Sequence, residues 1–329
     1  MSELSRRNLM QLAWAAALPA CPGLSQAQSG WPSKPVRLIV PYAAGGGTDA
    51  VARLIAERIT QDTKWPIIVD NKPGGAGNIG LDLVAKAAAD GYTLGLGQTS
   101  NLAINPVAME RVPFNEQKDF VAVAALAEVP TILVVRQDAP WGTLADLIKA
   151  GRSSGSQLRQ GLAGTGTVGH LAGVMLARKA GLNNVLDIPY KGAAPAITDL
   201  LGGQTDCMFA TPQAVIGMLK AGRLRALAVT SLTRLAILPN TPTVAESGFA
   251  GFQATDWKLL VAPAKTPKEL LQKLNAAAER ALAQSATRER LAAEGSLPLG
   301  GSLEAAARFL QTEQARWREL IKASAIKFD

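Results

Sequence analysis

Short runs of β-branched and aliphatic residues alternate along this chain with longer amphipathic segments, and this alternation limits the folds open to it. Residues 36–40 have the pattern of a strand, and residues 49–59 that of a helix with apolar side chains on one face. Further strands are expected at residues 67–69, 92–96, 132–135, near 160, 187–190, 207–210 and 226–230, and further helices at residues 79–88, 143–150, 170–179 and 195–201. Strands that alternate with helices form crossover units. The pattern therefore predicts an α/β fold with largely parallel sheets.

The size of the chain favours two lobes over one. The chain has 329 residues, of which 48% are hydrophobic, and single hydrophobic cores stop growing beyond roughly 250–300 residues. The strand and helix pattern starts again after residue 136, and two further helices follow near the C-terminus. The extended segments 134–136 and 260–263 are candidates for the two chain crossings. We expect a first lobe of residues 28–135 and 254–329 and a second lobe of residues 136–253.

The first residues have the composition of an export signal. The basic pair Arg6 and Arg7 precedes an apolar run at residues 9–18, and small residues follow at 25–27. This is the pattern of a secretory signal, whose apolar part is too short to span a bilayer. Paired arginines also fit the twin-arginine route. We expect cleavage after Ala27 and a periplasmic destination in a Gram-negative cell.

The chain has two cysteines, Cys21 and Cys207. Cleavage of the signal would remove the first. A rival interpretation is a lipoprotein with an acylated Cys21, but Pro19 two residues before it disfavours this. Loss of Cys21 would leave one thiol, which can form neither an intramolecular disulfide nor a thiolate metal cluster.

The charge balance argues against a nucleic-acid partner. The formal net charge is +8, yet the sequence has no basic run and only three tyrosines and seven phenylalanines. A clustered phosphate-binding face and stacking platforms are therefore missing from the pattern. The excess of positive charge suits an anionic ligand, or serves solubility alone.

A glycine-rich loop follows the first expected strand. Residues 41–49, PYAAGGGTD, lie between a strand and a helix, and they offer unhindered backbone N–H groups beside a helix N-terminus, which suits an anion. Thr48 or Asp49 is expected to cap the helix. Three consecutive glycines weaken a turn entropically, so they indicate close approach to the backbone. We expect ligand contact through this loop.

A second glycine-rich loop, NKPGGAGNIG at residues 71–80, again follows a strand and opens a helix. Within it, Gly75-x-Gly77-x-x-Gly80 matches the dinucleotide fingerprint. The acidic residue expected about 20 positions further on is not evident near Asn101. We therefore interpret the loop as a second backbone cradle that faces the first across a cleft.

A third candidate loop, GTGTVGH at residues 164–170, carries two hydroxyls, Thr165 and Thr167, in a glycine-rich turn before a helix. Hydroxyls and amides suit a carboxylate. The loop ends at His170, the only histidine of the chain. We expect His170 to pack at the start of the helix, with ligand contact and metal binding as alternatives.

The motifs of common enzymes are absent from the sequence. It contains no Gly-x-Ser-x-Gly elbow, no Walker loop, no metal-ligand spacing and no paired carboxylates at a catalytic spacing. One histidine without a partnered nucleophile gives no catalytic triad. We expect a protein that holds a ligand, without enzyme activity, metal or cofactor.

Seven motifs in succession resemble one receptor family. They are PYAAGGGTD at 41–49, NKPGGAGNIG at 71–80, ADGYT at 89–93, PYKG at 189–192, DLLGGQ at 199–204, PTVAESG at 242–248 and APAKTP at 262–267. In order and spacing they are similar to those of the tripartite tricarboxylate transporter receptors, also called Bordetella uptake gene receptors. The resemblance covers essentially the whole mature chain.

This resemblance implies a two-lobed periplasmic binding protein of the type II-like class, in which two Rossmann-like α/β domains are joined by two crossover segments. It implies a small carboxylate ligand, such as an amino acid, a dicarboxylate, a tricarboxylate or an aromatic acid, held largely by backbone amides and ordered waters. It also implies delivery of that ligand to the membrane subunits of a transporter. The family's binding residues carry over to Tyr42, Ala43, Ala44, Gly45, Gly46, Gly47, Thr48, Asp49, Gly74, Gly75, Gly77, Asn78, Ser100, Asn101, Thr165, Thr167, Lys191 and Asp206.

The chain departs from the family pattern at two places. Where many members have Trp-x-Gly-Leu, this chain has WKLL at residues 257–260, so Leu259 replaces a glycine near the hinge. We expect this leucine to alter closure or the pocket volume. Where a serine-threonine-histidine run is common, residues 100–102 are SNL, which changes one contact with the ligand.

Two other functions are compatible with the sequence. An exported nucleotide-dependent oxidoreductase would use the fingerprint at residues 75–80 and the twin-arginine route. A ligand-sensing subunit would dock its closed form on a sensor kinase in place of a transporter. Both alternatives keep the export signal and the two lobes.

Overall fold

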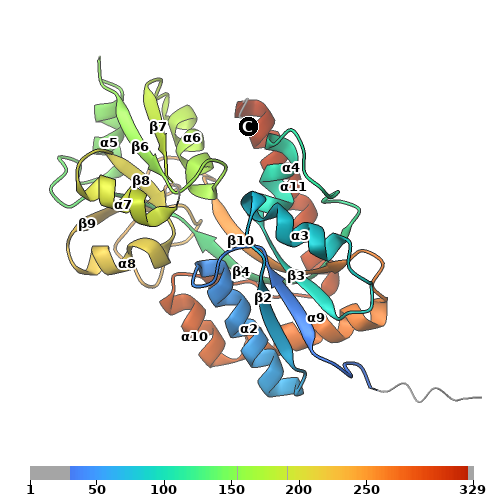
Figure 1. Ribbon diagram of the computed structural model, residues 1–329. Coiled ribbons are helices and arrows are strands. Elements are labelled where there is room, and N and C mark those ends of the chain that lie inside the picture. The colour runs from blue at the N-terminus through green and yellow to red at the C-terminus, as the bar shows by residue number, and fades with distance from the viewer. Residues whose placement is uncertain (1–29, 154, 191, 325–329) are drawn as a thin grey trace, which may run out of the picture. The chain divides into compact units, whose positions relative to one another are not determined.

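The computed structural model describes residues 30–153, 155–190 and 192–324 (Figure 1). The expected signal peptide, its cleavage site, Cys21 and the site residue Lys191 lie outside these ranges. Residues 35–329 group into one compact unit. Within it, two separate sheets with their own helices form the two lobes of a mixed α/β fold.

The first sheet has six strands in the order β11-β4-β10-β3-β1-β2. In that order they span Leu297–Pro298, Phe120–Pro130, Thr255–Pro263, Thr93–Gln98, Val36–Val40 and Ile67–Asn71. Strand β1 pairs in parallel with β2 and β3, whereas β10 is antiparallel to both β3 and β4. The sheet is therefore mixed, and not largely parallel as expected, because β10 starts where the chain returns from the second lobe and so runs against its neighbours.

The second sheet has five strands in the order β7-β6-β8-β5-β9. In that order they span Val185–Pro189, Leu158–Leu162, Cys207–Ala210, Ile132–Arg136 and Leu224–Val229. Strand β6 is parallel to β7 and β8, and β5 is antiparallel to β8 and β9. This sheet is mixed for the same reason, since β5 begins at the crossing from the first lobe.

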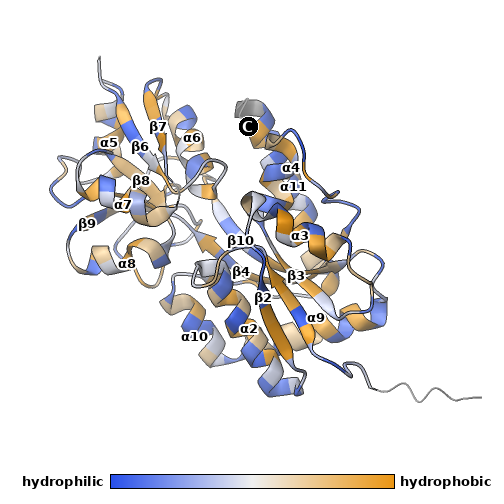
Figure 2. Ribbon diagram, viewed as in Figure 1, coloured by the Kyte–Doolittle hydropathy of each residue, from blue (hydrophilic) through white to orange (hydrophobic). Residues whose placement is uncertain are grey.

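Helices cover both faces of each sheet (Figure 1). The first lobe has α2 (Gly47–Thr63), η1 (Gly75–Gly77), α3 (Asn78–Ala85), η2 (Ser100–Ile104), α4 (Asn105–Ala108), α9 (Lys268–Ala283), α10 (Ser285–Ala293) and α11 (Leu303–Ser324); the second has α5 (Leu144–Gly151), α6 (Val168–Ala180), α7 (Ala193–Leu201) and α8 (Pro212–Lys220). In the first sheet, β2 and β3 lie on opposite sides of β1, so right-handed crossovers bring α2 and α3 to opposite faces. Figure 2 shows mainly hydrophobic strands between helices with mixed surfaces. No described helix has the length and apolar character needed to cross a membrane.

Both chain crossings lie earlier than predicted. The expected crossing segments 134–136 and 260–263 are inside β5 and β10. The chain instead passes between the sheets at Thr131 and near Ala254, and Thr230 ties the two passages together. The Thr131 N–H donates to Thr230 Oγ1 at 2.8 Å, and Thr230 Oγ1 donates to the Ala254 carbonyl at 2.6 Å. The lobe boundaries remain a prediction. They place residues 132–135 in the first lobe, whereas β5 (Ile132–Arg136) belongs to the second sheet.

Candidate functional site

Helix N-termini from both lobes converge where the parallel strands end. In the first lobe α2, α3 and η2 follow β1, β2 and β3, and in the second lobe α6, α7 and α8 follow β6, β7 and β8. The carboxyl ends of parallel strands are the usual ligand-binding edge of α/β sheets. The free N–H groups and the dipole at a helix N-terminus favour an anion.

A cavity of about 330 Å³ lies between these two edges. It takes residues from both lobes and, through Thr131, from one of the two chain crossings. Its lining comprises Tyr42, Ala76, Gln98, Ser100, Asn105, Thr131, Ala163, Gly164, Thr165, Gly166, Thr167, Val168, Gly169, Ala193, Phe209, Ala210, Thr211 and Asp256. Four of the predicted site residues, Tyr42, Ser100, Thr165 and Thr167, are among them.

The second-lobe wall includes the whole loop at residues 164–169, in which three of the six residues are glycines. Thr167 is the N-cap of α6: its Oγ1 accepts from the His170 N–H at 3.3 Å and donates to the Gly164 carbonyl at 2.9 Å. The first backbone N–H groups of α6 have no hydrogen-bond partner within the helix itself. At Gly169 a Cβ atom would lie 2.4 Å from the Phe209 carbonyl oxygen. Only glycine allows this close packing, which fixes the loop on β8.

His170 braces this loop from behind. Its Nδ1 accepts from the Gly166 N–H at 3.2 Å, and its Nε2 lies 3.3 Å from Asp187 Oδ2. Asp187 also accepts from Gln160 Nε2 at 3.0 Å. The side chain is buried, so the expected packing role at the helix start is confirmed. Across the residues that the structure describes, no cluster of three or more potential metal ligands occurs.

The first-lobe wall is built from side chains, of which Tyr42 is the largest. Its hydroxyl donates to the Ala76 carbonyl at 3.1 Å and accepts from Asn101 Nδ2 at 3.4 Å. A Cβ atom at Gly77 would lie 2.6 Å from this hydroxyl, so the predicted Gly77 makes room for Tyr42. Burial, and then the negative charge of Asp256, raise the pKa of Tyr42 well above its usual value. Tyr42 therefore stays a neutral hydrogen-bonding group.

An amide cluster lies beside Tyr42. Asn105 Nδ2 donates to the Ala76 carbonyl at 3.1 Å and to Asn78 Oδ1 at 2.9 Å, and Asn101 Oδ1 accepts from the Gln98 N–H at 2.9 Å. Asn105 lines the cavity, whereas Asn78 and Asn101 are buried behind it. These two predicted contact residues position the residues in front of them.

The loop at residues 43–49 supports the wall without lining the cavity. The prediction that Thr48 or Asp49 caps α2 is wrong, because the N-cap is Gly46 and both side chains lie within the first turn. The Asp49 carboxylate accepts from the Gly45 N–H and from Arg53, each at 2.9 Å. Burial raises the pKa of Asp49, but these hydrogen bonds and one from Asn71 outweigh it and hold the pKa below its usual value.

The two glycine-rich loops of the first lobe do not face each other. They follow β1 and β2, which are neighbours in one sheet, so the loops lie side by side and meet through the Tyr42 to Ala76 hydrogen bond. The expectation of a cradle at residues 71–80 opposite the first loop is wrong. The segment across the cavity is residues 163–169. Gly74 and Gly75 instead shape the entry to α3, where both have positive φ angles.

Asp206 lies away from the cavity. It precedes β8, while the cavity residues Ala210 and Thr211 lie at the opposite end of that strand. Both carboxylate oxygens are occupied by Arg159, with Nη2 to Oδ1 at 2.7 Å and the Arg159 N–H to Oδ2 at 2.8 Å. Asp206 does not line the cavity, because this ion pair holds it at the start of β8 beside β6; a contact of Asp206 with the ligand stays a prediction.

The two departures from the family pattern have structural roles. Leu259 is fully buried in the core between β3 and β4 and does not line the cavity. Leu259 therefore makes no direct contact with the cavity, and its expected effect on closure or pocket volume stays a prediction. Of residues 100–102, only Ser100 lines the cavity, since Asn101 supports Tyr42 and Leu102 is in the core.

Several cavity residues had no motif to identify them. Gln98 and Asp256 belong to β3 and β10, and Thr131 belongs to a crossing. Asp256 and Lys258 interrupt the apolar run of β10, and charged residues in a buried strand are a usable signal for a site. The convergence of β3, β10 and the crossing could not be read from the sequence.

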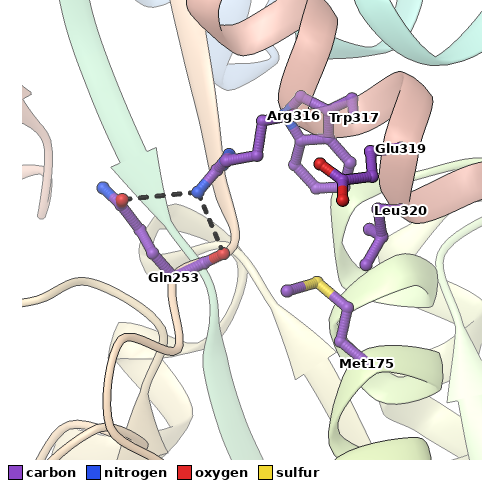
Figure 3. A pocket seen from close by; sticks show the side chains of 6 residues that line it. All are labelled: Met175, Gln253, Arg316, Trp317, Glu319 and Leu320. Atoms are coloured by element: carbon purple, nitrogen blue, oxygen red, sulfur yellow. Dashed lines mark hydrogen bonds between the residues drawn. The ribbon is translucent and has the colours of Figure 1, made fainter.

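A second cavity, of about 280 Å³, lies between α6 and α11 (Figure 3). Met175 of α6 lies opposite Trp317 and Leu320 of α11. Arg316 donates to the carbonyl and to Oε1 of Gln253, each at 3.3 Å. No helix N-termini converge on this cavity, and the Arg316 guanidinium is already hydrogen-bonded to Gln253 in the segment before β10. The cavity between the strand ends is therefore the better candidate for a ligand site.

Comparisons with known proteins define the class and then the family. A model described as the tripartite tricarboxylate transporter family receptor matches residues 51–326. The "UPF0065 protein in tcbD-tcbE intergenic region" of Pseudomonas sp. (strain P51) is 36% identical over 322 residues, covering 98% of this chain and 95% of that protein. The structure titled "R. palustris Rpa4515 with adipate" is 34% identical, with a TM-score of 0.82 over 90% of this chain and 99% of that one. MatC from Rhodopseudomonas palustris with bound malate is 32% identical, with a TM-score of 0.77 over 88% of this chain and 100% of that one.

These similarities fit the two-sheet fold of a periplasmic solute-binding protein. The chain belongs to the tripartite tricarboxylate transporter receptor family. The family is one of substrate-binding receptors and not of enzymes, which weighs against the oxidoreductase alternative.

Proposed function

We propose that this receptor captures a small carboxylate in the cavity between its lobes and delivers it to the membrane subunits of a tripartite tricarboxylate-type transporter. The observation that carries the proposal is the backbone loop at residues 164–169, whose N–H groups and helix dipole meet the first-lobe wall across a cavity of about 330 Å³. This volume is at the small end of the range of roughly 300–1,000 Å³ that ligand pockets span. Relatives whose structures hold adipate and malate support the same ligand class.

Capture is expected to work through differential affinity. A ligand that touches both lobes stabilises the arrangement in which both walls contact it, and it shifts the population towards that arrangement. The passages at Thr131 and Ala254 are the segments about which the lobes would move, because they are the points where the chain passes between the sheets.

A thermal-shift screen of the protein with small mono-, di- and tricarboxylates and aromatic acids tests the ligand class. A ligand at about 100 times its Kd should add about 2.7 kcal/mol to the free energy of unfolding. Sodium chloride at matched ionic strength is the control for general salt effects. A folded protein that no acid stabilises would contradict the proposal.

The export route is part of this proposal. We expect Arg6→Lys combined with Arg7→Lys to block export if the twin-arginine pathway carries the protein. Cell fractionation of the two forms measures this. Equal amounts of both forms in the periplasm would favour a different export route.

The partner is a separate question. If the partner were a sensor kinase, the kinase should bind the receptor only in the presence of the ligand.

A further inference from the structure

Strand β10 carries an ion pair into the first-lobe wall of the cavity. Asp256 and Lys258 are two residues apart on β10, so their side chains leave the same face of the strand. Asp256 Oδ2 accepts from Lys258 Nζ at 2.5 Å, and the two side chains are 16% and 3% exposed, respectively. Asp256 lines the cavity and Lys258 does not. The ammonium therefore lies behind the carboxylate as seen from the cavity.

Lys258 is fixed in this position by a second partner. Its Nζ donates to Gln98 Oε1 at 2.8 Å, and the same oxygen accepts from Thr48 Oγ1 at 2.6 Å. Burial lowers the pKa of Lys258, and the negative charge of Asp256 opposes that shift. Lys258 thus neutralises the pair overall while the negative end of the pair faces the cavity.

Asp256 retains unused capacity to accept hydrogen bonds. Oδ1 has no hydrogen-bond partner within the described ranges of the chain. A buried carboxylate oxygen without a partner is costly, and a donor on a ligand would remove that cost. The raised pKa of Tyr42, to which Asp256 contributes, is a further sign of negative potential on this wall.

The two walls of the cavity therefore have opposite preferences. The second-lobe wall offers backbone N–H groups at the N-terminus of α6 and suits a carboxylate. The first-lobe wall offers the Asp256 carboxylate, which suits an ammonium and repels a second carboxylate. Such a cavity discriminates between ligands by what they carry at the end opposite their acid group.

We propose that the ligand of this receptor is an amino acid in the broad sense, whose carboxylate binds the backbone of residues 164–169 and whose ammonium binds Asp256. The inference rests on the proposed capture of a carboxylate in this cavity and narrows its ligand class. The receptor should thus disfavour dicarboxylates, although relatives with adipate and malate are structurally similar to it.

Calorimetry with pairs of ligands of similar length tests the inference. The pairs are β-alanine with malonate, γ-aminobutyrate with succinate, ε-aminocaproate with adipate, and para-aminomethylbenzoate with terephthalate. In the best-binding pair the amino acid should bind at least about tenfold more tightly than the diacid, because placing like charges together is unfavourable. A diacid that binds equally or better overturns the inference and leaves the proposed function intact. Binding by no member of any pair overturns the inference, whereas the proposed function is overturned only if no acid of the thermal-shift screen stabilises the folded protein.

Variants identify Asp256 as the source of the preference. Asp256→Asn keeps the shape of the side chain and removes its charge. The double variant D256N/K258M also removes the buried ammonium, so neither partner of the pair is left uncompensated. Both should lose the preference for the amino acid, with the ratio of the two Kd values falling to about one. The control is Asp70→Asn, which should keep the ratio. Asp70 lies on the outer strand β2, away from the cavity, and its carboxylate is paired with Arg37 of β1. A preference that survives D256N/K258M overturns the inference.

Discussion

The two walls of the cavity present polar groups in different ways. The second-lobe wall uses backbone N–H groups held by a helix cap, His170 and the close packing of Gly169. The first-lobe wall uses side chains, in which Asp256, Lys258 and Gln98 form a buried network in front of the sheet. Backbone groups carry no charge that a substitution can remove, whereas the side-chain wall depends on each partner. From this comparison we expect general carboxylate affinity and ligand discrimination to depend on different lobes.

The largest expected effect is on the side-chain wall. Lys258→Met should lower the free energy of unfolding by about 3–5 kcal/mol, because it leaves the largely buried Asp256 carboxylate without its cation. Urea denaturation measures the change. D256N/K258M should recover much of the loss, since replacing both partners removes the uncompensated charge. If both variants were equally unstable, the packing of the lysine stem would be the important contribution, and not the ion pair.

On the backbone wall, Gly169→Ala should cost about 1–3 kcal/mol, because its Cβ would meet the Phe209 carbonyl at 2.4 Å. Gly217→Ala is the matched control, since Gly217 also lies in a helix and has open space around it. That variant should be more stable than the parent by roughly 0.4–1 kcal/mol. Thermal unfolding of the two variants measures the difference. Equal stability of the two would mean that the loop does not depend on this contact.

Loss of one helix cap should separate stability from ligand affinity. Thr167→Ala removes the N-cap of α6 in the cavity wall, and Thr143→Ala removes the N-cap of α5 away from it. Each should cost about 1 kcal/mol in stability. Only Thr167→Ala should also weaken ligand binding, which calorimetry measures. Similar affinity of both variants would show that the orientation of residues 164–169 does not control binding.

The smallest effect concerns the supporting loop of the first lobe and depends on pH. The pKa of Asp49 is held below its usual value in the folded protein, so its contribution to stability is present above the unfolded pKa and is lost as pH falls through the folded pKa. In the Asp49→Asn variant, the melting temperature should therefore fall less steeply as the pH is lowered. Melting temperatures from neutral to acid pH measure the slope. Parallel curves for the two proteins would contradict a linked role for Asp49.

Much of the fold could be predicted because its signal is local. The strand at Val36–Val40 and the helices α5, α6 and α7 have clear periodicity or caps, and the predicted ranges overlap those observed. Strand β4 was missed because its run, FVAVAALAEVP, is apolar on both faces and so lacks alternation. Helices α8 and α10 were also missed. The sequence predicts a crossing at residues 260–263, inside β10, because this extended run ends at Pro263.

The site was predictable where it follows a glycine-rich motif and unpredictable elsewhere. Tyr42, Ser100, Thr165 and Thr167 were identified and line the cavity. Asp206 was carried over from the family pattern, but Arg159 occupies its carboxylate. Whether the remaining predicted residues contact the ligand stays a prediction.

The sequence by itself determined the α/β class, the loops that follow each parallel strand and the family, because these depend on local periodicity and on ordered motifs. The tertiary structure decided which residues share the cavity. Asp256 is more than 150 positions from Gln98 and about 90 from Thr167 in the sequence, as their residue numbers show. They lie on one cavity because β10 returns from the second lobe between β3 and β4. Strand pairing of this kind depends on long-range packing and hydrogen bonding, which local sequence patterns do not specify.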